Sequence, residues 1–194
     1  GYKAFYLAIG CQGGRTAGVP GEDAAGIQTA VALLRTVGGD ESHKMTGKTV
    51  VIGGGNVAID AARVALRCGS SDVTMVCLEP REKMPASAEE IAEAEEEGTA
   101  IRCGYGPKEF LTKDGHVCGV VLKRCTGLYD AEGRFAPTYD ESVTITLPCD
   151  NVVLSIGQCI QWGNLLDGEA VQLGRGQGAV ADAMTYQTAQ SDIF

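Results

Sequence analysis

The chain has 194 residues, of which 44% are hydrophobic, and this suits one core-bearing domain, or one domain with attached pieces. The net charge of −9 argues against a nucleic-acid partner, because phosphate binding needs clustered lysine and arginine. No apolar run approaches the roughly 20 residues of a membrane span. With no signal peptide at its start, the sequence predicts a cytoplasmic protein.

Eight cysteines are scattered along the chain, and none forms a C-x-x-C pair. Their spacing argues against a thioredoxin-type redox pair and against the usual zinc and iron–sulfur sites. We therefore predict no metal site. We expect reduced thiols, several of which act as small hydrophobic residues in strands.

The first part of the chain contains a predicted strand and a predicted helix. Residues 2–10 have strand composition and end at Gly10. After a glycine-rich loop, apolar residues at i, i+3, i+4 and i+7 predict a helix from Ile27 to about Val37. A Gly-Gly-Asp break follows at residues 38–40.

The stretch from Thr49 to Gly69 predicts a strand, a glycine turn and a helix. Its first residues, Thr49-Val-Val-Ile52, form a β-branched run typical of a buried parallel strand. Its second half has helical apolar spacing and ends at Gly69, where a C-terminal cap belongs. Between the two, Gly53-x-Gly55-x-x-Ala58 fits the dinucleotide-binding fingerprint.

Each small residue of this fingerprint has a physical task. Gly53 permits the tight turn off the strand, Gly55 lets a pyrophosphate approach the backbone, and Ala58 lets the helix pack closely on the strand. The helix N-terminus offers N–H groups and a positive dipole end. The alternative is a tight turn that binds nothing. We predict cofactor contacts, partly through main-chain atoms, from Gly53, Gly54, Gly55, Asn56, Val57 and Ala58.

A second strand is predicted at residues 72–78, and its tip carries a carboxylate. Glu79 lies 21 residues beyond Ala58, where this fold places an acid on the adenosine ribose. Such a carboxylate accepts hydrogen bonds from the 2′-OH and 3′-OH and repels a 2′-phosphate. Arg81, two residues further on, favours NADPH instead, because an arginine can accommodate a 2′-phosphate. A solvated charge at a strand end is the remaining alternative.

Ser87-Ala-Glu-Glu90 is a capping box that starts a helix running to about Glu97 and stopping at Gly98. We expect its glutamates to form a solvated face and not a metal site. The helix has six glutamates: Glu89, Glu90, Glu93, Glu95, Glu96 and Glu97.

Beyond residue 100 the pattern changes to strands and tight turns. A third parallel strand is predicted at 101–103, and strands at 117–124 and 142–147 predict a small antiparallel meander with turns at 113–116 and 130–134. Residues 151–156 return to the buried-strand pattern, followed by Gly157 and a glycine-rich tail with a weak strand near 179–181. Both ends of the chain are abrupt, so we expect a piece of a longer protein.

The chain resembles the small (beta) subunit of glutamate synthase and related FAD-dependent NAD(P)H oxidoreductases of the pyridine nucleotide-disulfide oxidoreductase superfamily. The likeness spans nearly the whole chain, and its most specific parts are the glycine turn and Met84-Pro85-Ala86. The matching stretches are 5–10, 20–23, 50–60, 84–87, 95–98, 130–134, 153–158 and 188–194.

The resemblance implies an α/β fold: a Rossmann-like, three-layer nicotinamide-dinucleotide-binding domain with a small antiparallel β-meander, flanked by fragments of an FAD domain. It implies an NAD(P)H domain at residues 43–157, with FAD-domain pieces at 1–42 and 158–194. The fingerprint that holds FAD would lie upstream, so the fragment alone is expected to be inactive. Ile156 and Gly157, at a strand's carboxyl end, should line the nicotinamide side.

The implied activity is hydride transfer from NAD(P)H to FAD, with electrons passing on to a partner subunit, typically through iron–sulfur clusters. We assign no catalytic acid or base, because the hydride chemistry belongs to the cofactors. NADPH-using members carry Tyr-Arg-Arg where this chain has Cys77-Leu78-Glu79, which favours NADH. The alternatives are a flavoprotein subunit of another iron–sulfur oxidoreductase, a disulfide reductase, and a non-catalytic nucleotide-binding or sensing domain.

Overall fold

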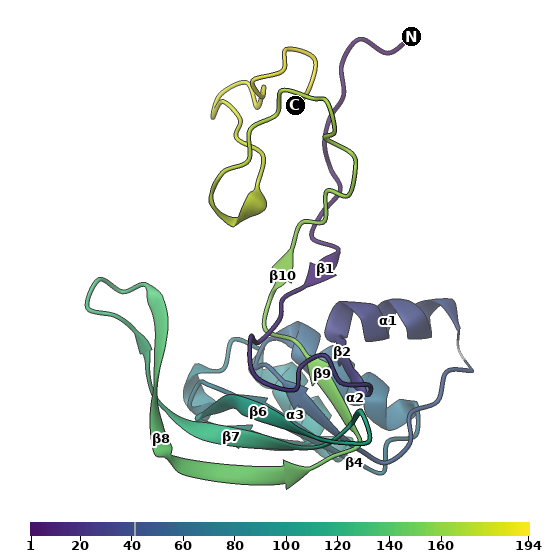
Figure 1. The fold of residues 1–194 in the computed structure, drawn as a ribbon, viewed down its shortest axis with the longest axis vertical. Coiled ribbons are helices and arrows are strands. Elements are labelled where there is room, and N and C mark those ends of the chain that lie inside the picture. Colours follow the sequence, from purple (N-terminus) through teal and green to yellow (C-terminus); the bar gives the residue numbers. More distant parts are fainter. Residues whose placement is uncertain (41) are drawn as a thin grey trace. The chain divides into compact units, whose positions relative to one another are not determined.

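The computed structural model describes residues 1–40 and 42–194. The chain divides into two compact units. Unit 1 consists of residues 1–13 and 157–194, and unit 2 is the continuous stretch 14–156. The short strands β1 (Gly13–Gly14) and β10 (Gln158–Cys159) lie where the chain passes between the units (Figure 1).

Unit 2 is built on a parallel sheet in the order β2-β9-β3-β4-β5. The central strand β3 pairs with β4 on one side and with β9 on the other, as its buried β-branched sequence predicts. The bounds are β2 (Ile27–Thr29), β3 (Lys48–Ile52), β4 (Asp72–Cys77), β5 (Ala100–Cys103) and β9 (Asn151–Leu154).

The helices of unit 2 pack on one face of this sheet. The apolar residues of α2 form a stripe that includes Ala58, Ile59 and Ala62, and these side chains share one core with Val51 of the sheet. The bounds are α1 (Ala30–Gly39), α2 (Asn56–Arg67) and α3 (Ala88–Glu96), with a single 3₁₀ turn η1 (Arg81–Lys83) before α3. In the described part of the chain, no helix is long and apolar enough to cross a membrane.

An antiparallel meander covers the opposite face of the sheet (Figure 1). It consists of β6 (Tyr105–Lys113), β7 (His116–Tyr129) and β8 (Phe135–Pro148). Val50 and Ile52 of β3 point into a second core with Val120 and Leu122 of β7, whereas Val51 between them faces the helices. The fold is therefore the three-layer α/β arrangement that the sequence predicts, with helices, parallel sheet and meander as the layers.

The predicted meander turn at residues 113–116 is confirmed. Asp114 has φ 53° and Gly115 has φ 79°, and Lys113 pairs with His116 across them. Two consecutive positive φ values mark the type I′ turn, which the Asp-Gly pair favours. The strand before this turn, β6, was not recognised in the sequence, because Gly106 and Pro107 interrupt its pattern.

Two expectations for the first part of the chain are wrong. Residues 2–10 form no continuous strand, and within them Phe5 makes an isolated bridge to Ile193. Ile27 lies in β2 and pairs with Val152, so the helix begins at Ala30 and not at residue 27. Thr29 caps this helix, since its Oγ1 accepts a hydrogen bond from the Ala32 N–H at 3.3 Å.

Unit 2 begins at Gly14, because β2 joins the sheet and Leu33 of α1 enters its core. In unit 1 both chain ends run together (Figure 1). The N–H of Phe5 donates to Asp192 O and that of Leu7 to Phe194 O, both at 2.7 Å. Residues 179–181 take part in isolated bridges only, and a single 3₁₀ turn, η2 (Arg175–Gln177), lies nearby.

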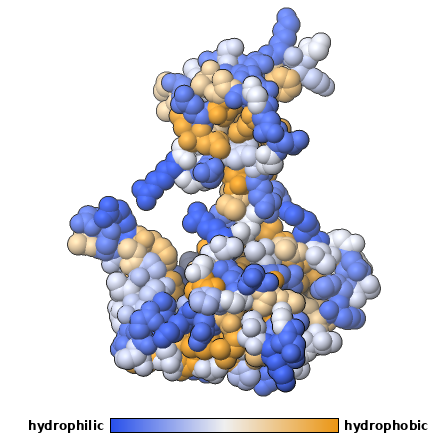
Figure 2. All heavy atoms as spheres, viewed as in Figure 1, coloured by the Kyte–Doolittle hydropathy of each residue, from blue (hydrophilic) through white to orange (hydrophobic). Residues whose placement is uncertain are grey.

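Unit 1 leaves several aromatic side chains at its surface, and Figure 2 shows apolar surface on this part of the molecule. Tyr6 is 76% exposed and Tyr186 is 65% exposed. Together with Phe5 and Phe194 they line a shallow apolar hollow. Such a surface is typical of a unit that packs against further protein.

Candidate functional site

The turn between β3 and α2 begins at a glycine that no other residue can replace without strain. Gly53 has φ +144°, and a Cβ built on it would lie 2.3 Å from the main-chain oxygen of Ser155. The Gly53 N–H donates to Val76 O at 2.8 Å. The turn is therefore wedged between the ends of β4 and β9, which fixes where the chain leaves the sheet.

The next two glycines differ in what surrounds them. A Cβ built on Gly54 would lie 2.8 Å from Cys77 Cβ and 3.1 Å from Glu79 Oε2, so this residue is closely packed. By contrast, outside the neighbouring stretch of its own chain, no described atom lies within 4 Å of a Cβ built on Gly55. Gly55 is the N-cap of α2, and it offers no capping side chain. The helix therefore begins at an open surface, with main-chain N–H groups and the positive end of its dipole.

This geometry is what a pyrophosphate requires: free N–H donors, open space and no side chain at the N-cap. Ala58 is fully buried and allows close packing of α2 on the sheet. Val57 is half-buried and packs against the helix-side core. The residues of the glycine turn thus fit the phosphate-binding part of a dinucleotide site.

Asn56 has a structural contact that the sequence did not reveal. Its Oδ1 accepts a hydrogen bond from the Ser87 N–H at 2.9 Å, across 31 residues. Ser87 in turn caps α3, since its Oγ accepts from the Glu90 N–H at 3.3 Å. The predicted capping box is therefore only half right: Asn56 takes the place of the Glu90 side chain at Ser87 N–H. Glu90 Oε2 is buried and has no described hydrogen-bond partner.

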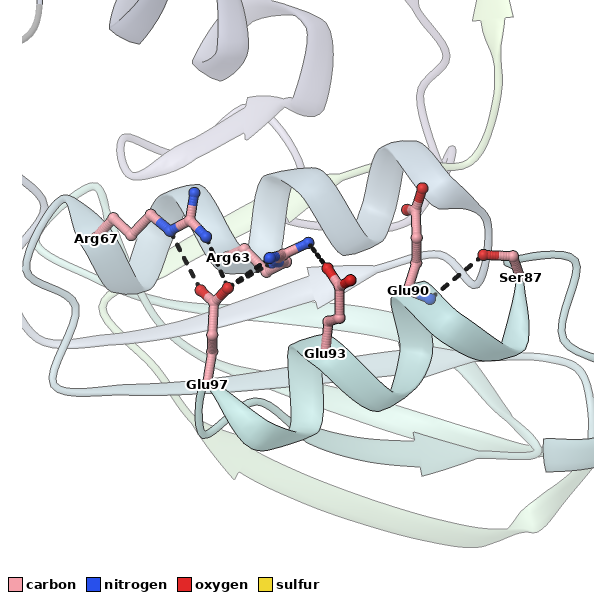
Figure 3. Close-up of polar contacts among 6 residues, drawn as sticks. All are labelled: Arg63, Arg67, Ser87, Glu90, Glu93 and Glu97. Atoms are coloured by element: carbon pink, nitrogen blue, oxygen red, sulfur yellow. Dashed lines mark hydrogen bonds and ion pairs between the residues drawn. The ribbon is translucent and has the colours of Figure 1, made fainter.

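The acidic face of α3 is an ion-pair surface and not simply a solvated one (Figure 3). Arg63 of α2 contacts Glu93 at 2.7 Å and Glu97 at 2.6 Å. Arg67, one turn further along α2, contacts Glu97 as well. The hydrogen bond from Arg63, and to a smaller extent the one from Arg67, lowers the pKa of Glu97 below its ordinary value. Most of these glutamates are exposed, as the sequence analysis expects for a solvated face. The ion pairs with α2 were not predicted, and they form because α3 lies directly against α2.

Glu79 lies just beyond the end of β4, with its carboxylate beside the glycine turn. The side chain is half-buried, and its Oε2 is near Gly54 as described above. Its main-chain oxygen accepts from Gly104 N–H at 3.2 Å, which fixes this corner to the end of β5. The predicted ribose-binding carboxylate is therefore adjacent to the predicted phosphate-binding turn.

Arg81 is exposed in η1 and forms an ion pair with Glu95 of α3. The guanidinium is therefore engaged by a carboxylate, which lowers its availability for a 2′-phosphate. Because both side chains are 44% exposed, the pair is weak and can be broken.

Ile156 and Gly157 follow the carboxyl end of β9. Ile156 packs against the meander-side core, and Gly157 has φ +110°. The preceding Ser155 donates its N–H to Ile52 O at 2.7 Å, so this end of β9 is tied to the end of β3. Ile156 thus lies at the strand edge where ligands of open parallel sheets bind.

Residues that the sequence analysis did not assign also shape the turn. The Ala86 N–H donates to Gly54 O at 3.0 Å, and Pro85 Cδ is 3.4 Å from a Cβ built on Gly54. The only signal for them was the Met84-Pro-Ala-Ser87 motif in the resemblance. Among the described residues, no group of three or more His, Cys, Asp or Glu side chains is placed to hold a metal.

A parallel sheet with a glycine turn opening into α2 and a meander on its other face is the arrangement of a dinucleotide-binding α/β domain. The chain belongs to the pyridine nucleotide-disulphide oxidoreductase family, whose match covers residues 1–194. Solved structures with this fold include thioredoxin reductase of Lactococcus lactis, with a TM-score of 0.69 and 18% identity over 99% of this chain and 56% of that one. Mycobacterium tuberculosis FprA in complex with NADPH has a TM-score of 0.66 and 21% identity over 96% of this chain and 54% of that one.

Curated relatives are similar over the whole chain. The beta subunit of an NADP(+)-dependent formate dehydrogenase from Moorella thermoacetica is 34% identical over 197 residues, which cover 100% of this chain and 28% of the relative. The glutamate synthase [NADPH] small chain of Halomonas elongata is 29% identical over 207 residues, covering 100% of this chain and 44% of the relative. The chain therefore spans less than half the length of these two relatives.

Proposed function

We propose that this chain is the NADH-binding part of an FAD-dependent oxidoreductase. The observation that carries the proposal is the Glu79 carboxylate beside the glycine turn, at the open N-terminus of α2. In this arrangement the N–H groups after Gly55 bind the pyrophosphate and Glu79 accepts hydrogen bonds from the adenosine ribose hydroxyls. Ile156 and Gly157 line the nicotinamide side.

NADH is favoured over NADPH on electrostatic grounds. A carboxylate at the ribose repels the 2′-phosphate of NADPH, and the nearby Arg81 is paired with Glu95. The printed names of the formate dehydrogenase and glutamate synthase relatives specify NADP(+) and NADPH, respectively. The cofactor choice proposed for this chain therefore departs from those relatives, and it rests on Glu79.

The longer protein would hold FAD, with residues 43–157 as the NADH domain and residues 1–42 and 158–194 as pieces of the FAD domain. When bound, the nicotinamide supplies a hydride for which the flavin is the acceptor. Several relatives are subunits of larger oxidoreductases, which supports electron delivery to a partner subunit. A glutamate synthase-like assembly or another iron–sulfur oxidoreductase would both provide such a partner.

Calorimetric titration with NADH and NADPH at matched ionic strength tests the proposal. NADH should bind at least about 10-fold more tightly than NADPH, and Glu79→Gln should weaken NADH binding about 10-fold, because hydrogen bonds to a charged group contribute roughly 1.5–3 kcal/mol. Glu79→Arg should reverse the preference. Glu82→Gln, which removes a nearby exposed carboxylate, is the matched control and should leave both affinities unchanged. Tighter binding of NADPH to the unmodified protein would contradict the proposal.

A further inference from the structure

Two cysteines far apart in the sequence are direct neighbours in the parallel sheet. Cys77, the last residue of β4, is the register partner of Cys103, the last residue of β5. Register partners in a parallel pair point to the same face, and both side chains pack on the helix-side core. The two thiols therefore meet at the carboxyl edge of the sheet, next to the glycine turn.

The spacing of the two residues is suitable for a covalent bond. Neighbouring strands lie about 4.8 Å apart, which is within the roughly 4.4–6.8 Å between Cα atoms that disulfides require. The side chains of both residues also make polar contacts beside the glycine turn: Cys77 Sγ donates to Glu79 O at 3.5 Å, and Cys103 Sγ is 3.9 Å from Met84 Sδ.

We propose that Cys77 and Cys103 are a redox-active dithiol whose oxidation to an intramolecular disulfide weakens dinucleotide binding at the adjacent glycine turn. The pair is separated by 25 intervening residues, so it has none of the C-x-x-C spacing by which such centres are found in sequences. The strand register alone brings the two sulfurs together.

The oxidant class is a hydroperoxide, and the two residues have different parts. Cys103 is half-buried, whereas Cys77 is buried, and burial together with Cys103 raises the pKa of Cys77 to about 12. Because Cys103 is the more exposed of the two, its sulfur attacks the peroxide. The O–O bond breaks, Cys103 becomes a sulfenic acid, and the hydroxide that leaves takes up the Cys103 proton as water. The Cys77 sulfur then attacks Cys103 Sγ. The S–S bond forms, the S–O bond breaks, and water leaves with the Cys77 proton. In total, two thiols and one hydrogen peroxide give one disulfide and two waters.

Oxidation of Cys77 should change the dinucleotide-binding site, because this residue makes two contacts with it. Its Cβ packs against Gly54, and its S–H holds the main-chain oxygen of Glu79. Disulfide formation consumes the Cys77 S–H, so the hydrogen bond that this group donates to Glu79 O is lost. This second part of the proposal rests on the proposed dinucleotide function, because it uses Glu79 and the glycine turn as the binding site.

The first experiment tests the bond itself on the full chain. Protein treated with stoichiometric hydrogen peroxide is digested without reduction, and its peptides are mapped by mass spectrometry. A linked pair of peptides containing Cys77 and Cys103 is expected, with a loss of two hydrogens. It should be absent in Cys103→Ser and Cys77→Ala and present in Cys68→Ala, a buried cysteine elsewhere in the helix-side core. Links among other cysteines with Cys77 and Cys103 left free would overturn the proposal.

The second experiment measures NADH binding by calorimetry before and after this oxidation. At least a threefold weakening is expected in the unmodified protein, reversed by dithiothreitol and absent in Cys103→Ser. An unchanged affinity in the linked protein overturns the coupling. If the reduced protein binds no NADH at all, the proposed function fails and the coupling with it, while the peptide map still decides whether the disulfide forms.

Discussion

At the scale of single residues, the glycine turn contains two glycines with opposite requirements. Gly53 needs its positive φ and the space against Ser155, whereas Gly55 has an ordinary φ of −93° and open space beside it. The first glycine is therefore required for the fold, whereas the second leaves open the space that the proposed pyrophosphate site needs. The sequence motif already predicts these different tasks, and the structure adds the physical reason for each: the close Ser155 oxygen at Gly53 and the open space at Gly55.

A pair of alanine substitutions separates the two roles. Gly53→Ala should destabilise the protein by about 2–4 kcal/mol, because the new methyl group meets the Ser155 oxygen at a strained φ. Gly55→Ala should cost about 1 kcal/mol at most, as an N-cap change, yet weaken NADH binding at least about 10-fold, since its methyl fills the space that the pyrophosphate needs. Thermal unfolding and calorimetry measure the two effects. Equal losses of stability in both variants would contradict this assignment.

At the scale of elements, α2 and α3 are joined side by side through charged residues. Arg63 and Arg67 reach from α2 to Glu93 and Glu97 (Figure 3). At the other end of α3, Asn56 holds the Ser87 N–H. These contacts hold both ends of α3 against α2. They also hold the loop before α3, in which the Ala86 N–H donates to Gly54 O.

The ion pairs between α2 and α3 predict a pH dependence of stability. Because Arg63 lowers the pKa of Glu97 in the folded state, Glu97 stabilises the protein above its ordinary pKa of 4.5, and this contribution is lost as the pH falls through the folded value. Glu97→Gln should therefore have a lower Tm than the unmodified protein at pH 7, and the difference should narrow below pH 4.5. Thermal melts from pH 7 to about 3 measure this. Glu96→Gln, its exposed neighbour, is the control, and a similar pH profile for both variants would argue against the ion pairs.

At the scale of the whole molecule, the two units differ in how much regular structure they contain. Unit 2 has a parallel sheet with covered faces, whereas unit 1 has isolated bridges, a 3₁₀ turn and exposed aromatic side chains. We therefore expect different local stabilities in the two units.

Hydrogen exchange measured by mass spectrometry checks this difference. The amides of β3 should exchange most slowly, because this strand is hydrogen-bonded on both sides and buried on both faces. Peptides from residues 160–192 should exchange much faster, by about two orders of magnitude or more. Comparable protection in both regions would show that unit 1 is as stable as the sheet.

The sequence by itself determined the local features of this protein. β-branched runs, the glycine turn, Gly69 as a cap and the Asp-Gly turn all depend on residues close together in the chain. Their patterns therefore predicted β3, α2, the Asp-Gly turn and strands within β7 and β8, but not β6. The family was evident from the same local motifs. The strand expected at residues 2–10 failed because composition does not provide a pairing partner.

Only the tertiary structure decided which distant residues meet. The bond from Ser87 to Asn56, the ion pairs between α2 and α3, and the pairing of Ile27 with Val152 each join residues far apart in the chain. The strand register also places Cys77 beside Cys103, which are far apart in the chain. These contacts depend on strand order, register and helix packing, which arise from the burial of the whole core and leave no pattern in any short stretch of sequence.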